Sequence, residues 1–388
     1  MKKDLNCIID FGQTHLKFNL ITENSIVTRT LVYKNKLTIL KNKSVYYDFL
    51  KIKNKIKHHL EKLFKNYKIN KISYVCHGSA CFFFDKYNRI NNGFHFSKKI
   101  NKSDLLVFKS YKPHFNETFT PDYKNLHNLG KNFFFINQKN TNVRFVPLNA
   151  YIGFIFSNKN IADPTYISCH SYLWDFKKKN YSSLVKNTLG LKKMPLLKNS
   201  GNYIANLNKN LIKLNYRCKI YNGGHDTSAA FYFHSIFFKR NTIFLSTGTT
   251  FVFGKILKKI KKIDEKSNFY YLNSLNMKDI LLSRRFMGGS LYNKIRQKKN
   301  ITNSNSLLAN YTFKELKNYL KIFNFNNFNL VIDGPFSQNK NFVLKLKKLN
   351  ENMNIYTAKN KHTPSLGMSY MCNKKKFDLP INKFYNKY

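Results

Sequence analysis

The N-terminal part of the chain has a hydrophobic pattern that predicts three strands, a helix and a fourth strand. The stretches 7–12 (CIIDFG), 16–22 (LKFNLIT) and 25–33 (SIVTRTLVY) are short, rich in β-branched and aromatic residues, and separated by polar or glycine-containing turns, as in an antiparallel meander. Between residues 47 and 67, apolar residues recur every three or four positions, which is typical of an amphipathic helix. The stretch 71–78 (KISYVCHG) predicts the next strand. This order is the beginning of an α/β domain.

A related order of elements returns, in altered form, in the second half of the chain. The pattern predicts a strand, a helix and two further strands at 218–224 (CKIYNGG), 227–238 (TSAAFYFHSIFF), 242–250 (TIFLSTGTT) and 251–256 (FVFGKI). Each half therefore has a turn of small residues directly after an apolar strand. We expect an internally duplicated α/β fold that holds a ligand between two lobes.

The remaining stretches complete the two lobes. The middle of the chain shows no regular pattern up to about residue 145, and residues 149–157 predict a helix. The last third predicts a helix, a strand, a helix, a strand and a short tail, with the four elements at 311–324, 329–334, 339–349 and 353–358. The 388 residues exceed the roughly 250–300 at which a single core stops growing. We expect an N-terminal lobe at 1–220 and a C-terminal lobe at 221–388.

The chain is strongly basic, with a formal net charge of +49. Such a charge is typical of proteins that bind nucleic acids or anionic membranes. Lysine, however, is spread along the whole chain together with many Asn, Ile, Phe and Tyr residues, as expected when an A+T-biased genome sets the residue choice. The densest lysine runs, at 51–59 and 255–263, have apolar residues interleaved at helix or strand spacing. We therefore favour a solvated basic surface with no nucleic-acid or membrane partner; a polyanion-binding patch is the alternative.

The cysteines and the N-terminus indicate a reduced compartment. Six cysteines are scattered without a CxxC pair, at positions 7, 76, 81, 169, 218 and 372, which argues against a zinc site or a disulfide framework. The N-terminal residues lack the apolar core of a signal peptide, and no stretch approaches 18 consecutive apolar residues. We expect a soluble cytoplasmic protein. Homodimerisation is compatible with the sequence, which does not specify an oligomeric state.

The first small-residue turn, DFGQTHLK (10–17), could hold an anion. Gly12 allows a tight turn, and Gln13 and Thr14 can present backbone N–H groups and a hydroxyl. Lys17 adds a cation, and Asp10 at the strand end is placed to hold a hydrated Mg²⁺. On its own this stretch fits an ordinary hairpin better than a phosphate site.

Two further turns carry the same kinds of group. In GGHDTSAA (223–230), Asp226 precedes a helix, where it is either a general base for a reacting hydroxyl or only a capping carboxylate. In LSTGTT (245–250), Thr247, Gly248 and Thr249 repeat the small residues and hydroxyls of the first turn. Two such turns that face each other from two lobes would form a phosphate clamp.

These motifs, in this order, resemble those of the FGGY family of carbohydrate kinases, which have the actin/hexokinase-type fold. The resemblance runs along nearly the whole chain and includes the segments 10–17 (DFGQTHLK), 75–80 (VCHGSA), 166–176 (YISCHSYLWDF), 223–230 (GGHDTSAA), 245–250 (LSTGTT), 284–290 (RRFMGGS), 331–339 (VIDGPFSQN) and 363–369 (TPSLGMS). The segment 166–176 is particularly similar to one in family members of the rhamnulokinase and xylulokinase type. The sequence departs from the family in having Gln13 where a Thr is common, and in its short C-terminal lobe.

The resemblance implies an α/β fold of two ribonuclease H-like lobes, with ATP and a sugar in the cleft between them. It implies ATP and Mg²⁺ as cofactors, with Asp10 holding the metal ion and Asp226 accepting the proton of a terminal hydroxyl of a ketose such as rhamnulose, fuculose or xylulose. The residues implied for ATP and phosphate binding are Gly12, Gln13, Thr14, Lys17, Thr247, Gly248, Thr249, Gly288, Gly289, Gly334 and Asn339. Those implied for the sugar are His77, Gly78, Trp174, His225 and Asp226.

Alternatives remain for some of these roles. His77 could be only a turn residue, and Trp174 could be a core side chain. A non-catalytic sugar or nucleotide sensor of the same fold is the alternative to a kinase, and nucleic-acid binding through the charge is a third hypothesis. Retention of both Asp10 and Asp226 favours the kinase.

Overall fold

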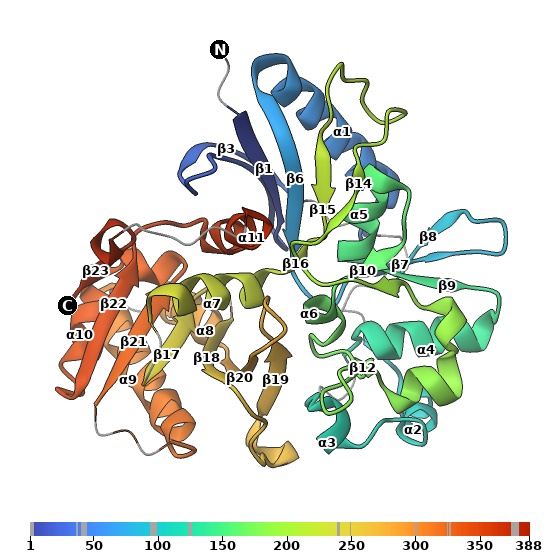
Figure 1. Cartoon of the computed structure of the whole chain (residues 1–388). Helices are drawn as coiled ribbons and strands as arrows, with labels where there is room; N and C mark the ends of the chain where they lie inside the picture. The colour runs from blue at the N-terminus through green and yellow to red at the C-terminus, as the bar shows by residue number, and fades with distance from the viewer. Residues whose placement is uncertain are drawn as a thin grey trace.

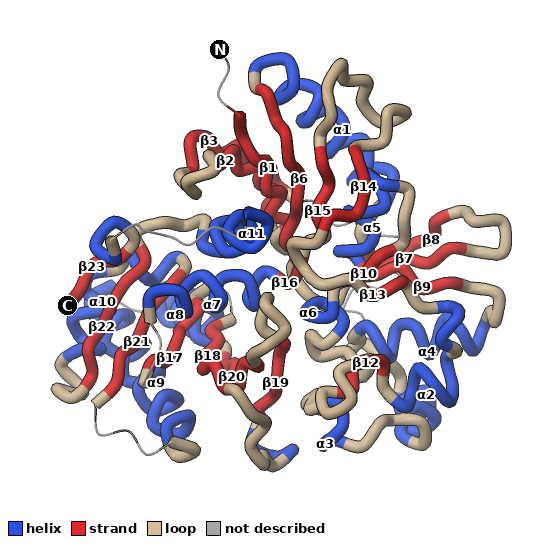
Figure 2. Tube along the Cα trace, in the orientation of Figure 1, coloured by secondary structure: helices blue, strands red, loops and turns tan. Residues whose placement is uncertain are grey.

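The structure is a computed structural model of the chain. It describes residues 4–35, 38–39, 45–93, 99–122, 126–238, 241–248, 250–298, 301–323, 325, 327–373 and 380–388. Two sheets lie in two lobes, with helices on their faces (Figure 1 and Figure 2). Among the described helices, none is long and apolar enough to cross a membrane.

The N-terminal sheet is built around the predicted meander. Its strand order is β14 (Tyr203–Asn206), β15 (Lys219–Tyr221), β6 (Lys68–Cys76), β1 (Asp4–Phe11), β2 (His15–Ile21) and β3 (Val27–Lys34), and β16 (Gly224–His225) also pairs with β6. Strand β1 is antiparallel to β2 and parallel to β6. The four strands and the helix α1 (Phe49–Asn66) predicted for residues 7–78 are therefore confirmed.

Helix α1 illustrates how the sequence pattern becomes packing. Ile52, Ile56, Leu60 and Leu63 recur at helical spacing and are buried, whereas the lysines of the same run are exposed or half-buried. The side chain of Asp48 accepts a hydrogen bond from the backbone N–H of Lys51 and caps the helix N-terminus. The basic run 51–59 thus includes the outer face of an amphipathic helix.

The C-terminal sheet repeats the mixed pairing. Its order is β19 (Phe269–Asn273), β20 (Ile280–Phe286), β18 (Phe251–Leu257), β17 (Thr242–Ser246), β21 (Phe328–Asp333), β22 (Met353–Ala358) and β23 (Tyr385–Lys387). Helices α8 (Gly288–Lys298), α9 (Ile301–Leu320) and α10 (Lys340–Lys347) belong to this lobe. The predicted helices at 311–324 and 339–349 and the strands at 329–334 and 353–358 are confirmed, although α9 begins earlier in the chain than predicted.

The prediction that the middle of the chain is irregular was wrong. This region contains a small sheet of order β8 (Ile90–Asn92), β7 (Cys81–Phe84) and β9 (Arg144–Pro147), and helices α2 (Lys102–Lys109), α3 (Phe115–Thr118), α4 (Leu129–Lys139) and α5 (Leu148–Ser157). The Phe runs 82–84 and 133–135 are buried on all sides. A segment that is apolar all round has no helical or strand period, so its type cannot be read from the pattern.

Two helices lie between the sheets and connect the lobes. Helix α7 (Asp226–Phe237) packs against α11 (Thr363–Asn373) so closely that a Cβ on Gly367 would lie 2.1 Å from the backbone oxygen of Ala229. Helix α11 also contacts the N-terminal sheet, where the Asn19 amide donates to Ser365 Oγ at 2.8 Å. Strand β16 still pairs with the N-terminal sheet, and α7 follows it directly in the chain and lies between the two sheets (Figure 1). The division into lobes at residues 1–220 and 221–388 stays a prediction.

Candidate functional site

The first turn brings a carboxylate and a cation together. Asp10 and Lys17 are directly opposite in the antiparallel pair β1–β2, and Lys17 Nζ lies 2.9 Å from Asp10 Oδ2. Asp10 is 4% exposed. The predicted metal-binding carboxylate is therefore held by a neighbouring ammonium in this structure.

Asn35, the residue after strand β3, makes hydrogen bonds to the backbone of this turn. The N–H of Gly12 donates to the carbonyl of His15 at 2.9 Å, and the Asn35 amide donates to the carbonyl of Gly12 at 2.6 Å. The backbone N–H of Asn35 donates to the carbonyl of Thr14 at 2.8 Å. Gln13 and Thr14 at the tip are exposed. The turn is thus a well-braced hairpin whose tip can face a ligand. Both an ordinary structural hairpin and a phosphate-binding turn are compatible with this geometry.

Asp226 is the first residue of α7 and enters the cleft between the lobes. Its Oδ1 accepts a hydrogen bond from the backbone N–H of Thr227 at 2.6 Å, and its side chain is 26% exposed. Burial raises the pKa of Asp226 to about 7, with the nearby negative charge of Asp10 adding to the effect and Thr227 and Lys17 opposing it. A carboxylate with this pKa is suited to accept a proton near neutral pH.

The predicted sugar-side residues His77, Gly78 and His225 lie together. His225 Nε2 is 3.2 Å from Cys169 Sγ and 3.4 Å from Asp226 Oδ1. A Cβ on Gly78 would lie 2.7 Å from Cys169 Sγ and 3.4 Å from His225 Nε2. Burial, with the neighbouring His77, lowers the pKa of His225 to about 3, so its imidazole is neutral.

Asp163 is a buried carboxylate that was not predicted from the sequence as a site residue, and hydrogen bonds through Thr165 link it to His225. Thr165 Oγ accepts the backbone N–H of His225 at 3.0 Å, and the Thr165 hydroxyl donates to Asp163. Ser200 donates to Asp163 through its N–H at 2.8 Å and its hydroxyl at 2.6 Å. Burial raises the pKa of Asp163, which is 0% exposed, to about 6, opposed by the Ser200 and Thr165 hydrogen bonds. The sequence shows only a helix-capping Asp-Pro-Thr, because the contact with His225 is distant along the chain.

The second small-residue turn packs against the turn that follows β21. The Thr247 hydroxyl donates to the carbonyl of Asp333 at 2.5 Å and accepts from the N–H of Phe336 at 3.1 Å. Gly334 has φ +84°, and a Cβ on it would lie 2.0 Å from the Thr247 backbone oxygen, so only glycine fits there. The hydroxyl of Thr247 is thus engaged within the lobe, and its phosphate contact remains a prediction. Thr249 lies outside the described residues.

The other predicted nucleotide residues lie in the C-terminal lobe. Gly288 and Gly289 begin α8, where a Cβ on Gly288 would lie 2.6 Å from the Phe251 ring. Asn339 caps α10 by accepting the N–H of Phe342 at 3.1 Å, and its amide donates to Asn305 at 2.8 Å. The structure thus gives Gly288 and Asn339 packing and capping roles, and nucleotide contacts remain predictions.

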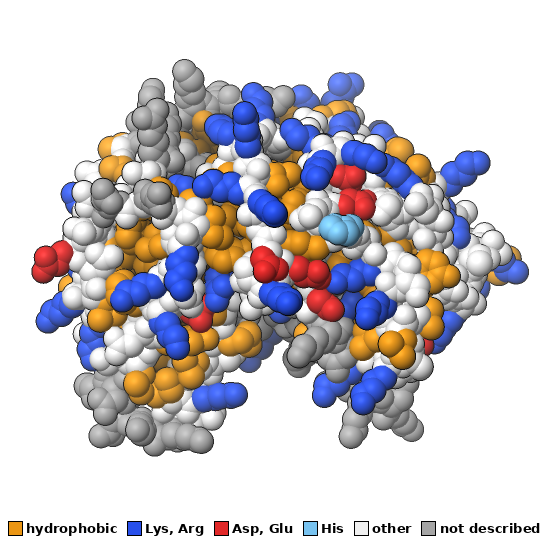
Figure 3. All heavy atoms as spheres, turned by 90° about the horizontal axis from the view of Figure 1, so that it is seen from below, with side chains coloured by type: hydrophobic (Ala, Val, Ile, Leu, Met, Phe, Trp, Pro, Cys, Tyr) orange, Lys and Arg blue, Asp and Glu red, His pale blue; other side chains and the backbone are white. Residues whose placement is uncertain are grey.

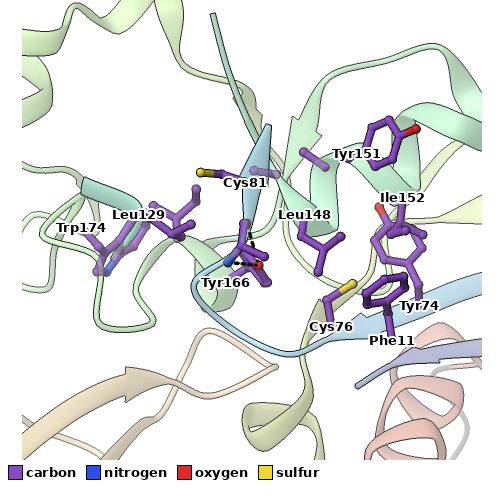
Figure 4. Packing of buried hydrophobic residues seen from close by; sticks show 14 of the residues in the cluster. Phe11, Tyr74, Cys76, Cys81, Leu129, Leu148, Tyr151, Ile152, Tyr166 and Trp174 are labelled. Carbon is purple, nitrogen blue, oxygen red and sulfur yellow. Dashed lines mark hydrogen bonds between the residues drawn. The ribbon is translucent and has the colours of Figure 1, made fainter. Parts of the chain in front are cut away.

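Trp174 is not brought to the cleft. Its side chain is 2% exposed and belongs to the buried cluster of the N-terminal lobe, shown in Figure 4 together with Leu129 and Tyr166. The core alternative for this residue therefore fits the structure better than the sugar-wall role.

A cavity of about 400 Å³ joins the two lobes beside Asp226. Its lining includes residues of β2, β3, α7, β17, the turn after β21 and the start of α11, namely Lys17, Val32, Asp226, Thr227, Ala230, Ser246, Asp333, Gly334, Pro335, Lys361, His362, Thr363 and Pro364. His362 Nε2 lies 3.4 Å from Thr30 Oγ and so reaches across from the C-terminal lobe. Lys361 and His362 were not predicted, because nothing in the sequence distinguishes them from other basic residues.

The fit of Mg²⁺ depends on Asp10. Within the part of the chain that the structure describes, no group of three or more His, Cys, Asp or Glu side chains could hold a metal ion alone. Mg²⁺ commonly binds through one or two carboxylates, water and substrate phosphates. Asp10 is a single buried carboxylate beside Lys17, which lines the cavity, and it fits that mode of binding if Lys17 releases it.

Comparisons with known proteins identify the fold. No protein-family model matches the chain, and no curated protein matches it in sequence. Among solved structures, a carbohydrate kinase from Novosphingobium aromaticivorans matches with a TM-score of 0.82 and 16% identity, over 95% of this chain and 93% of that chain. A ligand-bound xylulose kinase from Lactobacillus acidophilus matches with a TM-score of 0.84 and 13% identity, over 99% and 93% of the two chains.

A third solved structure has a similar fold. Plasmodium falciparum glycerol kinase with ADP matches with a TM-score of 0.78 and 13% identity, over 96% of this chain and 90% of that chain. The predicted fold class is therefore confirmed, and this chain has the two-lobed α/β fold of carbohydrate kinases of the actin/hexokinase type.

Proposed function

We propose that the protein is an ATP-dependent carbohydrate kinase of the FGGY type, with a ketose as acceptor. The observation that carries the proposal is the position of Asp226. This carboxylate has a raised pKa and lines the same cavity as Lys17 of the N-terminal lobe and Gly334 of the C-terminal lobe. The fold, which is shared with carbohydrate kinases, supports the same conclusion.

In the proposed reaction, Asp226 accepts the proton of the acceptor hydroxyl while that oxygen attacks the γ-phosphorus of ATP. The bond from the γ-phosphorus to the bridging oxygen breaks, and ADP leaves with that oxygen. Lys17, which lines the cavity and is paired with Asp10 in this structure, would turn towards the γ-phosphate. Phosphoryl transfer needs mainly positioning and neutralisation of charge, which these groups provide.

Asp10 would hold Mg²⁺, which neutralises phosphate charge when bound. Its carboxylate is buried at the end of β1 and is part of the electrostatic environment of Asp226. The exposed tip of the first turn, Gln13 and Thr14, would contact the phosphates from the N-terminal lobe. The loop after β17 and the Gly334 turn would approach the nucleotide from the C-terminal lobe.

The acceptor would lie on the side of Asp226 where the segment 75–80, with His77 and Gly78, is located. Gly78 and His225 pack against Cys169 there, and the Nδ1 atom of the neutral His225 lies 3.3 Å from Ser228 Oγ, within the protein. A polyhydroxylated acceptor would suit this side of the cleft, because its hydroxyls can pair with polar groups such as the Asp226 carboxylate, which is 26% exposed.

The test is an ATP-dependent phosphorylation screen with purified protein. The acceptors are L-rhamnulose, L-fuculose, D- and L-xylulose and L-ribulose, with glycerol and gluconate added for comparison. We expect turnover with at least one ketose, and a loss of at least about 1,000-fold in kcat for Asp226→Asn. Asp48→Asn is the control, because Asn can replace Asp48 as the helix cap of α1 and Asp48 does not line the cavity beside Asp226.

Two results would contradict the proposal. If the Asp226→Asn variant phosphorylated a ketose at the wild-type rate, Asp226 would not be the general base. ATP binding without phosphorylation of any acceptor would favour the sensor of the same fold.

A further inference from the structure

The carboxylate of Asp333 is buried in the C-terminal lobe and has no part in the reaction proposed above. Asp333 ends strand β21, its side chain is 6% exposed, and it lines the cavity beside Asp226. Its Oδ1 accepts the backbone N–H of Gly334 at 2.6 Å. Its Oδ2 accepts the hydroxyl of Thr363 at 2.5 Å and lies 3.1 Å from His234 Nε2. The carboxylate is thus held from three directions at the wall of the cavity.

The ionisation of Asp333 decides which way these hydrogen bonds point. Burial raises the pKa of Asp333, but the groups that donate to it, His234 above all, hold this pKa below its ordinary value of 3.8. An ionised carboxylate can only accept hydrogen bonds, so His234 donates from Nε2. In the neutral imidazole the other nitrogen, Nδ1, accepts from the hydroxyl of Tyr385, whose oxygen lies 2.8 Å away. The donors therefore run in one direction, from Tyr385 through His234 to Asp333.

His234 connects the helix of Asp226 to this carboxylate. It lies about two turns after Asp226 in α7, and its side chain is 0% exposed. Its ring stacks on the ring of Phe244 in β17, with the centroids 5.6 Å apart and the planes at 29°. A buried ring that is packed on one face and hydrogen-bonded at both nitrogens is held in one orientation. His234 therefore fixes the position of α7 relative to the end of β21.

Four segments that line the cavity meet at Asp333. Helix α7 reaches it through His234, α11 through its first residue Thr363, and the turn after β21 through Gly334. The end of β17 reaches its carbonyl oxygen, which accepts the N–H of Thr247 at 2.8 Å. Cavity residues in or beside these segments include Thr227, Ala230, Ser246, Gly334, Pro335, Thr363 and Pro364. The C-terminal side of the cavity therefore depends on the position of this one residue.

We propose that Asp333 and His234 are positioning residues for the nucleotide, and that the hydrogen bond between them holds the turn after β21 where it receives ATP. This inference rests on the proposed function, because it takes ATP as the ligand of the cavity. Neither side chain needs to touch the nucleotide, since both are buried and already paired. The effect falls on ATP affinity more than on the chemical step, because Asp226 is also fixed from the N-terminal lobe by the bond from His225 to Thr165.

The test is isothermal titration of the full chain with ATP and with ADP, in Mg²⁺ and without an acceptor, for two amides at position 234. Gln can place its amide N–H close to the position of the imidazole Nε2–H and still donate to Asp333, whereas the Asn side chain is one methylene shorter and does not reach. We expect His234→Asn to weaken ATP binding about tenfold or more, and His234→Gln to weaken it less than about threefold.

A second pair of variants keeps the test decisive if His234→Asn fails to fold. Thr363→Val removes a hydroxyl that donates to Asp333, and Thr363→Ser retains it, so only the Val variant should bind ATP about tenfold more weakly. The control is Tyr319→Phe in the same lobe. The buried hydroxyl of Tyr319 donates to the carbonyl of Leu282 at 2.6 Å, and Tyr319 does not line the cavity. This variant also loses a buried hydrogen bond but should bind ATP as the wild type does.

The titrations must separate the cavity from the basic surface. Lys and Arg side chains are spread over the face of the molecule in Figure 3, and the chain has a net charge of +49. Exposed cations bind a nucleotide non-specifically, and salt screens that attraction, so the titrations are run at about 0.5 M NaCl. The two members of each pair carry the same charge, so any residual surface binding is the same in both.

The outcomes distinguish this inference from the proposed function. If the wild type bound neither ATP nor ADP, both would be wrong. If the wild type bound ATP, and His234→Asn and Thr363→Val bound it equally tightly, this inference alone would be wrong. Equal losses within each pair would assign the effect to packing and not to the hydrogen bonds of Asp333, and would also overturn it. So would a loss in Tyr319→Phe as large as that in His234→Asn.

Discussion

Thr165 Oγ accepts the backbone N–H of His225 at 3.0 Å, and so fixes the residue that directly precedes Asp226. The Thr165 hydroxyl in turn donates to the buried Asp163. Asp226 is thereby placed by a chain of hydrogen bonds that begins in α6 (Pro164–Ile167), and not only by its own helix.

Removing this hydroxyl should lower the rate without weakening ATP binding. Thr165→Val keeps the volume but leaves the His225 N–H and the Asp163 carboxylate each without one partner, which costs about 1–3 kcal/mol. We expect kcat to fall about 10- to 100-fold with little change in the KM for ATP, because the nucleotide is proposed to lie mainly on the other lobe. Thr165→Ser retains the hydroxyl and should retain most of the activity. Equal losses in the two variants would indicate that packing, and not the hydrogen bond, is what matters.

The close contact between Gly78 and Cys169 predicts that a substitution of Cys169 can compensate for a substitution of Gly78. Gly78→Ala would place a methyl group 2.7 Å from Cys169 Sγ and 3.4 Å from His225 Nε2, so one of these side chains must move. We expect the single variant to lose about tenfold or more in kcat/KM for the acceptor. In Gly78→Ala/Cys169→Ala the sulfur is gone and the remaining Cys169 Cβ position is 3.7 Å away, which is ordinary contact. Steady-state kinetics should show recovery in the double variant, and an additive further loss would refute the steric explanation.

The raised pKa of Asp226 predicts how activity depends on pH. A base must be unprotonated to act, so kcat/KM should rise with pH up to about 7 and then level off. Lys17 lowers this pKa, and its removal should therefore shift the midpoint of the profile to higher pH. The measurement is the pH profile of kcat/KM for the wild type and for Lys17→Met. A reduced rate with an unchanged midpoint in Lys17→Met would show that Lys17 does not act on Asp226 electrostatically.

The same pKa predicts that an inactive variant is more stable. Because the pKa of Asp226 in the folded protein, about 7, lies above its ordinary value of 3.8, the wild type loses stability as the pH rises from about 4 through 7. Asp226→Asn carries no charge and avoids this loss. We expect Asp226→Asn to exceed the wild type in unfolding free energy by about 1–4 kcal/mol at pH 8, with the difference vanishing near pH 4. Urea unfolding at the two pH values measures this, and a variant less stable than the wild type at pH 8 would contradict it.

The sequence alone specified those parts of the protein whose signal is local. Strands β1, β2 and β3, helix α1 and helix α7 were predicted, because a period of two or of three to four residues records which side of an element is buried. The three small-residue turns were found for the same reason, since Gly, Thr and Asp beside an apolar strand differ from their neighbours within a few positions. Their common order along the chain also indicated the two-lobed fold.

The tertiary structure alone decided what lies far apart in the sequence or is buried on all sides. The Phe-rich middle region has no period to read, and the support of His225 by Asp163 through Thr165 joins segments that are distant in the chain. Whether Trp174 faces a ligand or the core depends on which elements cover it, and the identity of one residue does not predict those elements. Folding also decided that Lys17 pairs with Asp10, because their register across β1 and β2 follows from the hairpin and not from either residue.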